Sequence, residues 1–159
     1  MKKKEEVAAL LLRLTIGFGF MAHGWAKISR GTAGFEKLLA FEGVPFPHLN
    51  ALVGPYVELL GGLALILGAY VVIVAVPLLV TMLVALFFVQ GHYGFSAVKT
   101  MGLTPEGPLF GPPGYEINLL YISGLVSLIC TGPGLLSLDR LRKAKVRPDG
   151  RSRPHRHLR

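Results

Sequence analysis

Residues 59–91 read LLGGLALILGAYVVIVAVPLLVTMLVALFFVQG, thirty-three positions without one Asp, Glu, Lys, Arg or His. As a single helix this stretch would be about 50 Å long, whereas the hydrocarbon core of a bilayer is about 30 Å thick. The stretch must therefore reverse direction. Gly68-Ala69-Tyr70 is the expected turn because glycine adopts turn conformations without steric cost. The sequence thus predicts two consecutive membrane-spanning helices here.

The rest of the chain extends this pattern. Only 16% of the 159 residues are charged, whereas a soluble domain carries about 25%. Four apolar blocks have about the length that a bilayer requires, the last only if residues 131–138 extend it: 7–26, 49–69, 71–91 and 115–130. We therefore expect an all-α fold, an integral membrane four-helix bundle in residues 1–139, followed by a basic, disordered cytoplasmic tail in residues 140–159.

The first block follows a basic start and is similar to a signal peptide. Arg13 interrupts its apolar run, however, and no small-residue cleavage site precedes His23. We therefore expect this segment to remain as the first helix.

Basic residues gather at both ends of the chain. Three precede the first block and nine follow Ser137, whereas the two loops expected on the opposite side of the membrane carry four. The positive-inside rule places such basic ends in the cytoplasm, and an even number of spans also puts both ends on one side. Because the basic tail directly follows an apolar bundle, we interpret it as a contact with membrane lipid at the cell membrane and not with nucleic acid.

A few ionisable side chains lie within or beside the predicted spans. Such groups cost roughly 2.5–3.5 kcal/mol each at the bilayer centre and usually face the bundle interior. Counted along their helices, Arg13 and Glu58 differ in depth by only ~6 Å, which predicts that they pair. The others fall within a turn or two of the non-cytoplasmic face. We therefore predict one polar site in the outer half of the bundle, with His23 and Glu58 as catalytic residues, Arg13, Lys27, His92 and Glu116 as ligand-binding residues, and no metal.

These residues also have a purely structural interpretation. An Arg13–Glu58 pair would fix the helix register, His23 would bond a backbone carbonyl, and Lys27 would reach the headgroups. Small residues favour close packing, since Gly54 and Gly62 share a helical face with Glu58. Aromatic residues typical of a membrane belt lie at the outer interface: Trp25, Tyr56, Tyr93 and Tyr115. Pro-rich segments predict stiff outer loops.

An ordered set of residues runs across the predicted spans: Arg13 with Gly17, His23-Gly24 with Lys27, Glu58 with Gly61-Gly62 and Gly68, then Gly132-Pro133-Gly134 and Leu138-Asp139. Over about residues 8–139 this set resembles the DoxX family of small four-helix membrane proteins. The resemblance implies a membrane subunit of a quinone-linked oxidoreductase or of a thiol or oxidative-stress system. It also implies that Arg13, His23, Lys27 and Glu58 are the family's recurrent polar positions.

Three functions remain open at this point. In the first, the bundle is a redox subunit with quinone as the cofactor, and it needs a protein partner because the chain has no flavin fingerprint, iron–sulfur spacing or thiol pair. Cys130, the lone cysteine, is expected to pack as a small apolar residue. In the second, the protein is a non-enzymatic membrane assembly or scaffold protein, acting with a partner or as a homo-oligomer. In the third, it is a small proton-coupled carrier.

Overall fold

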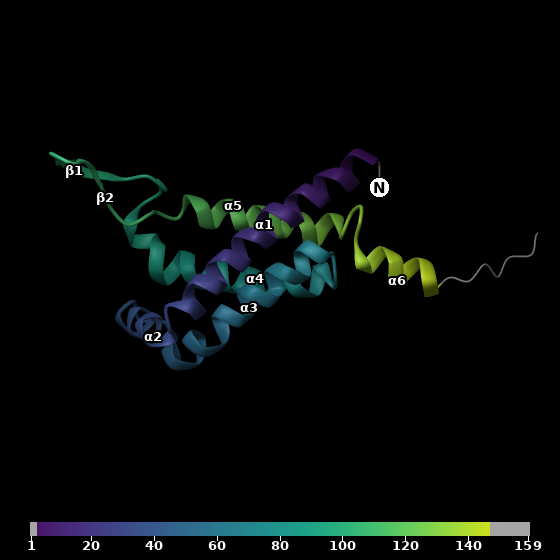
Figure 1. The fold of residues 1–159 in the computed structure, drawn as a ribbon, viewed down its shortest axis with the longest axis horizontal. Helices are drawn as coiled ribbons and strands as arrows, with labels where there is room; N and C mark the ends of the chain where they lie inside the picture. The colour runs from purple at the N-terminus through teal and green to yellow at the C-terminus, as the bar shows by residue number, and fades with distance from the viewer. Residues whose placement is uncertain (1–2, 147–159) are drawn as a thin grey trace, which may run out of the picture.

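The computed structural model describes residues 3–146 of the chain, and they are mostly helical (Figure 1). The elements follow in this order: α1 (Lys3–Ser29), α2 (Thr32–Phe41), α3 (Pro47–Leu67), α4 (Val71–Val84), the π-helix η1 (Ala85–Gln90), the 3-10 turn η2 (Gly91–Tyr93), β1 (Thr100–Thr104), β2 (Gly107–Phe110), α5 (Glu116–Thr131) and α6 (Leu138–Val146).

Within residues 3–146, three helical segments are long and apolar enough to cross a membrane: α1, α3 and the continuous segment from α4 to η2. The fourth apolar helix, α5, has 16 residues, which corresponds to about 24 Å. The predicted extension of this helix through residues 131–138 is wrong, because Gly132 adopts a φ of 78° and ends the helix. The following Pro133 has no backbone N–H with which to continue it.

Helices α1, α3, α4 and α5 form a ring in which each packs against two others. Helix α1 packs against α3 and α5, and α4 packs against the same two helices, so α3 and α5 are a diagonal pair. Figure 1 shows α1 crossing the others obliquely, with the β1–β2 hairpin at one end of the molecule and α6 beside the N-terminus at the other. We call these the hairpin end and the α6 end.

The turn between α3 and α4 lies where the sequence predicts it. Gly68 and Tyr70 both have positive φ, 66° and 50°, and the Ala69 N–H bonds the Ala64 carbonyl. Two backbone N–H groups at the start of α4 have no acceptor within the helix. They donate to the Asp139 carboxylate, at 2.7 Å from Tyr70 and 2.9 Å from Val71. The residues between α5 and α6, 132–137, thus form a strap that ends on this turn.

Glycines hold α1 and α3 at backbone contact. A Cβ added to Gly62 on α3 would lie 2.5 Å from the Gly17 carbonyl oxygen on α1, and one added to Gly24 would lie 2.5 Å from the Pro55 carbonyl oxygen. Real Cβ atoms do not approach this closely, so larger side chains would force the helices apart. Small residues at a crossing are typical of membrane helix pairs, where packing replaces the hydrophobic driving force.

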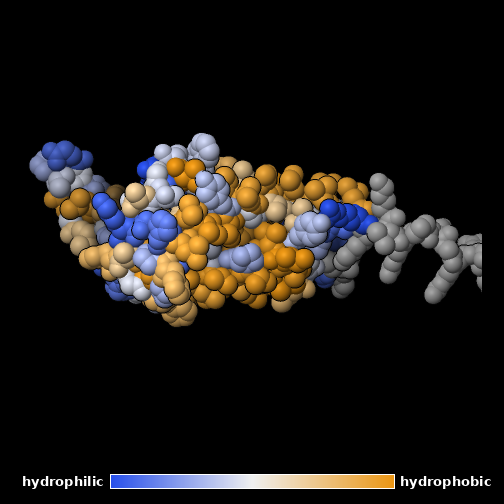
Figure 2. Space-filling model, turned by 90° about the horizontal axis from the view of Figure 1, so that it is seen from below, coloured by the Kyte–Doolittle hydropathy of each residue, from blue (hydrophilic) through white to orange (hydrophobic). Residues whose placement is uncertain are grey.

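The surface between the two ends is apolar. Figure 2 shows a broad hydrophobic band over the bundle, with polar residues towards the two ends. Large apolar side chains such as Ile73 and Phe87 are exposed there, whereas the bundle interior is built around Phe20 and Leu125. Exposed apolar side chains around a narrow packed core are what a lipid-facing bundle requires.

Both connections expected on the non-cytoplasmic side carry regular structure. The first contains α2, and the second contains the antiparallel hairpin of β1 and β2. The amphipathic α2 places Leu39 in a small core with Val44 and Ala51, which proline and glycine patterns alone did not indicate.

Two expectations for the C-terminal part also differ from the structure. The start of the basic tail forms α6, which Arg140 ties to α1 through Glu6 at 2.7 Å, so the predicted disorder does not hold for residues 140–146. Residues 147–159 lie outside the described residues. Cys130 is exposed on α5 and not packed inside, because Leu125 and Leu128 occupy the buried face of that helix.

Candidate functional site

A cavity of about 360 Å³ lies inside the half of the bundle nearest the hairpin end. Its walls come from α1, α2, α3, α5 and the segment from α4 into η1, and they are mostly apolar. Helix α2 covers it with Phe35, Leu38 and Leu39. The polar side chains that line it are His23, Lys27, Asn50, Glu58, Thr81, Gln90, Asn118 and Tyr121.

The centre of the polar lining is an ion pair between α1 and α3. The Lys27 ammonium donates to both oxygens of the Glu58 carboxylate, at 2.6 and 2.7 Å. The Glu58 side chain is 5% exposed and that of Lys27 is 28% exposed. Lys27 Nζ also lies 4.7 Å from the centroid of the Phe35 ring on α2, so the ammonium has a second favourable partner.

The direction of helical side chains explains this pairing. A side chain on a helix leans toward that helix's own N-terminus. Helices α1 and α3 are consecutive long helices joined through α2, and they run in opposite directions (Figure 1). Lys27 therefore leans back toward the membrane interior, and Glu58 leans out to meet it. The Gly24–Pro55 contact, one turn from each residue, brings the two backbones close enough.

His23 lies four residues before Lys27 and therefore on the same face of α1. It lines the cavity, and its ring lies 6.5 Å from that of Tyr121 on α5. Tyr121 packs edge-on against Phe20 at 5.1 Å, and its hydroxyl rests on Gly19, where no side chain would fit. The three residues that the structure brings together from the predicted set are thus His23, Lys27 and Glu58.

Arg13 does not join this group, and its predicted pairing with Glu58 is wrong. It is fully buried toward the α6 end, where Nη2 donates to the carbonyls of Leu135 at 2.9 Å and Leu136 at 3.2 Å. The Cα depths of Arg13 and Glu58 were a poor guide, because Arg13 leans toward the N-terminus of α1 and Glu58 leans the opposite way. Arg13 instead fills the space that Gly68 leaves by having no side chain.

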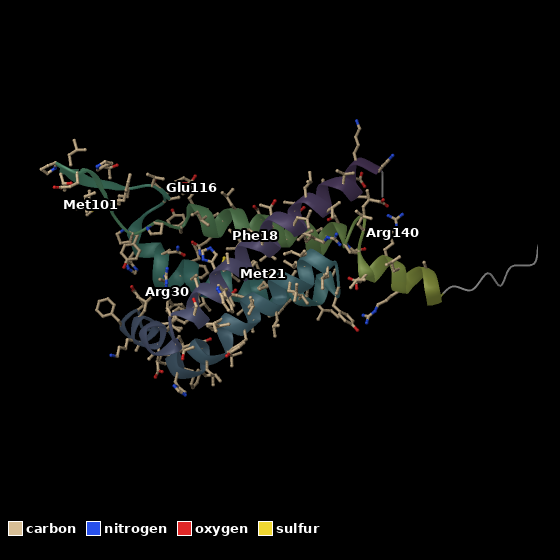
Figure 3. The ribbon with its side chains drawn as sticks, viewed as in Figure 1. Phe18, Met21, Arg30, Met101, Glu116 and Arg140 are labelled. Atoms are coloured by element: carbon tan, nitrogen blue, oxygen red, sulfur yellow. The ribbon has the colours of Figure 1, made fainter. Side chains whose placement is uncertain are left out.

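The other two predicted ligand-binding residues lie at the hairpin end but do not line the cavity. His92 Nε2 lies 3.5 Å from the carboxylate of Glu42, which also accepts a hydrogen bond from the Tyr93 hydroxyl at 3.3 Å. Glu116 accepts from the Ala97 N–H at 2.9 Å, and Figure 3 shows it at the start of α5 near the base of the hairpin. Both carboxylates hold connecting segments in place.

Sequence reasoning missed Asn118 and Glu42. Asn118 is 3% exposed and lines the cavity, and its Oδ1 has no hydrogen-bond partner. The sequence did contain a signal for Asn118, because an amide side chain stands there inside the apolar block 115–130, two residues after the predicted site residue Glu116. Glu42 has a side chain only 6% exposed, but it lies in a segment that was expected to be a loop.

Across residues 3–146, no group of three or more His, Cys, Asp or Glu side chains is arranged to hold a metal ion. The site is instead a mostly apolar cavity with one internal ion pair, one histidine and one unpartnered amide. Such an arrangement is typical of a pocket for a small organic ligand.

The fold and this site define a helical membrane protein with a polar cavity between its helices. The chain matches the DoxX family over residues 8–91, and it belongs to that family. It is 29% identical to Escherichia coli "Inner membrane protein YqjF" over 91% of this chain and 99% of that protein. It is 31% identical to Bacillus subtilis "Putative oxidoreductase CatD" over 87% of this chain and 90% of that protein.

A third relative is Mycobacterium tuberculosis "Uncharacterized membrane protein Rv3486", with 29% identity over 84% of this chain and 80% of that protein. No solved structure matches the chain. The comparisons therefore support the class and the family, and the resemblance described from the sequence is confirmed.

Proposed function

We propose that this protein is a four-span protein of the cell membrane, with both termini in the cytoplasm and α5 as its fourth span. Helix α5 is short at 16 residues, and a bilayer adjusts to a short span by local thinning at modest cost. The basic α6 then lies at the cytoplasmic surface, where it contacts anionic lipid. The hairpin lies on the opposite side.

Cysteine labelling tests this topology. In a Cys130→Ser background, Glu106→Cys places a thiol in the hairpin turn, and Ala144→Cys places one on α6. A membrane-impermeant maleimide added to intact cells should label only the hairpin thiol, and permeabilised cells should show both. Labelling of the α6 thiol in intact cells contradicts the proposed orientation.

The proposed activity is that of a membrane subunit of a quinone-linked oxidoreductase, with the cavity as the quinone site. The observation that carries it is the Lys27–Glu58 pair beside His23 in an otherwise apolar cavity of about 360 Å³, which falls in the usual range for small-ligand sites. The apolar walls suit a ring, and the name of the Bacillus relative supports a redox role.

A bound quinone supplies two-electron, two-proton chemistry, and the electrons come from a partner protein of the redox class. The chain's own residues then hold charge and protons. The Lys27 ammonium stabilises negative charge on a ring oxygen, and Glu58 holds that ammonium in place. His23 lies on the same face of α1 and is exposed at the cavity wall, and its imidazole nitrogens can donate or accept a proton.

Direct binding tests the proposal. The full-length protein in detergent is titrated with 2,3-dimethyl-1,4-naphthoquinone, whose substituted ring cannot add to the exposed Cys130, and the heat of binding is measured. Glu58→Gln should weaken binding at least about tenfold, equivalent to ~1.4 kcal/mol. Glu36→Gln is the matched control, because Glu36 pairs with His48 on the surface and does not line the cavity. Absence of binding to the unmodified protein, or unchanged binding by Glu58→Gln, contradicts the proposal.

A non-enzymatic assembly role is the second candidate, and the hairpin end favours it. Leu103 and Phe110 on the hairpin and Phe41 on α2 are exposed apolar side chains outside the bundle. Such side chains are typical of a surface that contacts a partner protein or a second copy of the chain. If a stable partner co-purifies and all cellular functions survive His23→Ala and Glu58→Gln, this role replaces the redox one.

A further inference from the structure

We infer that Asn118 selects the ligand, so that the cavity accepts a ring with two oxygen substituents on opposite sides. This inference rests on the proposed function, and it names the substrate class as a para-dicarbonyl ring together with its dihydroxy form. Asn118 is the specificity-determining residue, and it acts at the oxygen farther from the Lys27–Glu58 pair.

The first observation is the state of the Asn118 side chain. It is 3% exposed, lines the cavity, and carries an Oδ1 that is buried without a hydrogen-bond partner. An unsatisfied buried polar atom costs about 1–3 kcal/mol. A ligand that bonds this carboxamide removes that cost when it binds.

The second observation excludes the ordinary structural role for this residue. Asn118 is the third residue of α5, where a side-chain oxygen often accepts from the free N–H groups of the first helical turn. No side-chain cap bond is formed at this end of α5, and Oδ1 has no partner at all. The amide oxygen is therefore not used by its own helix, and the residue that carries it lines the cavity.

The third observation is where the two polar groups stand. Glu58 lies on α3 and Asn118 on α5, and these helices are the diagonal pair of the ring. The rest of the lining is mostly apolar and includes Phe35, Leu39 and Val84, with Thr81, Gln90 and Tyr121 as further polar side chains. A largely apolar ring that carries one oxygen at each end can bond polar groups of both helices while it fills this mostly apolar cavity.

A carboxamide suits this task because it is both a donor and an acceptor. Its NH₂ group donates to a carbonyl oxygen, and its oxygen accepts from a hydroxyl. Rotation about the terminal torsion, which is soft and close to two-fold, exchanges the two groups. Asn118 can therefore bond the ring in both its dicarbonyl and its dihydroxy forms, whereas a carboxylate or an aliphatic side chain cannot.

The test compares two probes of similar shape on the same variants. The dicarbonyl probe is the dimethyl-naphthoquinone used above, and the monocarbonyl probe is 1-tetralone, a fused ring with one oxygen. Asn118→Leu keeps the branched shape and the number of side-chain heavy atoms but removes the polar atoms, and Asn118→Ser is a second, smaller variant. Ser123→Ala on the exposed face of α5 is the control, since Ser123 bonds only the Leu120 carbonyl of its own helix.

The dicarbonyl probe should bind Asn118→Leu at least about tenfold more weakly than the unmodified protein, while the monocarbonyl probe changes less than about twofold. Asn118→Ser should retain part of the discrimination. Equal losses for both probes would show that Asn118 only packs, and unchanged binding would show that it is not used; either result overturns the inference.

The same titrations separate the two proposals. If the dicarbonyl probe binds and depends on Glu58 but not on Asn118, the proposed function stands and only this inference is overturned. If neither probe binds the unmodified protein, both are overturned together.

Discussion

Gly62→Ala adds one methyl group at the closest approach of α1 and α3. The new Cβ would lie 2.5 Å from the Gly17 carbonyl oxygen and 2.8 Å from the Met21 nitrogen. Ordinary contacts begin at 3.4 Å, so the two helices must separate by about 0.9 Å. Both neighbouring atoms belong to the backbone, and neither can rotate away as a flexible side chain would.

The size of the effect follows from that separation. A gap of about 0.5–1 Å removes a quarter to a half of the dispersion energy of each affected atom pair. Overpacking of this kind costs typically ~1–3 kcal/mol. Gly54→Ala is the matched control, because it makes the same substitution in the same helix with nothing within 4 Å of the new atom. There the alanine should stabilise the helix by about 0.5–1 kcal/mol.

Thermal unfolding of the two variants in one detergent measures the difference. At roughly 2–4 °C for each kcal/mol, Gly62→Ala should unfold about 5–10 °C below Gly54→Ala. Gly24→Ala should behave like Gly62→Ala, since its Cβ would lie 2.5 Å from the Pro55 carbonyl oxygen. If Gly62→Ala is as stable as Gly54→Ala, the close glycine packing of α1 on α3 does not hold.

Three further predictions concern polar contacts. Lys27→Met and Glu58→Gln should each lower the free energy of chemical unfolding by about 1–3 kcal/mol, which is below the full range for a buried ion pair because Lys27 is partly exposed. The double variant should lower it by less than the sum of the two single effects, and additive effects would contradict the pairing. Asp139→Ala should lower the free energy of unfolding by about 1–2 kcal/mol, because it removes the acceptors of the Tyr70 and Val71 N–H groups. The control, Glu106→Ala in the hairpin turn, should change the free energy of unfolding by less than about 0.5 kcal/mol. Tyr93→Phe removes a hydrogen-bond donor to Glu42, the residue that follows α2, and should speed hydrogen exchange of the α2 amides several-fold. The α3 amides serve as the unchanged reference. If the α2 amides exchange equally fast in both proteins, the Tyr93–Glu42 bond does not hold α2 in place.

The sequence predicted the three helical segments of membrane-spanning length because their cause is simple, whereas the fourth predicted span corresponds to the shorter α5. Thirty-three uncharged residues cannot cross a bilayer once, and glycine at position 68 allows the reversal that α3 and α4 show. The meeting of His23, Lys27 and Glu58 near the hairpin end also followed from depth along two helices. Depth is a one-dimensional property, and a sequence with regular helices gives it directly.

The depth of a residue along its helix does not give the direction of its side chain, and the wrong predictions arise from this difference. Arg13 and Glu58 have similar Cα depths, but their side chains lean to opposite ends of the bundle. The rotation of a helix about its own axis is equally hidden, which is why Asn118 was missed and why Cys130, expected to pack as a small apolar residue, is exposed. The short α2 and the hairpin depend on contacts with residues far along the chain, and no local period announces them.

The position of Arg13 divides the predicted polar residues of this chain between the two ends of the bundle. They do not form one site but two, at opposite ends of the bundle. At the α6 end, Arg13 donates to carbonyls near the end of the strap, and Asp139 accepts hydrogen bonds from the turn between α3 and α4, so both residues hold the strap and the turn in place.

Buried polar atoms without a hydrogen-bond partner occur at both ends, Nε and Nη1 of Arg13 at the α6 end and Oδ1 of Asn118 at the hairpin end. The hairpin end differs because its polar groups line a cavity. Lys27 and Glu58 satisfy each other, yet they do so at the wall of a cavity that also presents His23 and the unpartnered oxygen of Asn118. Stability alone does not require an open cavity beside a buried ion pair, since packed apolar residues of similar volume are often at least as stable. The cavity, with an ion pair, a histidine and an unpartnered amide oxygen among its lining residues, is therefore the feature on which the proposed ligand site rests.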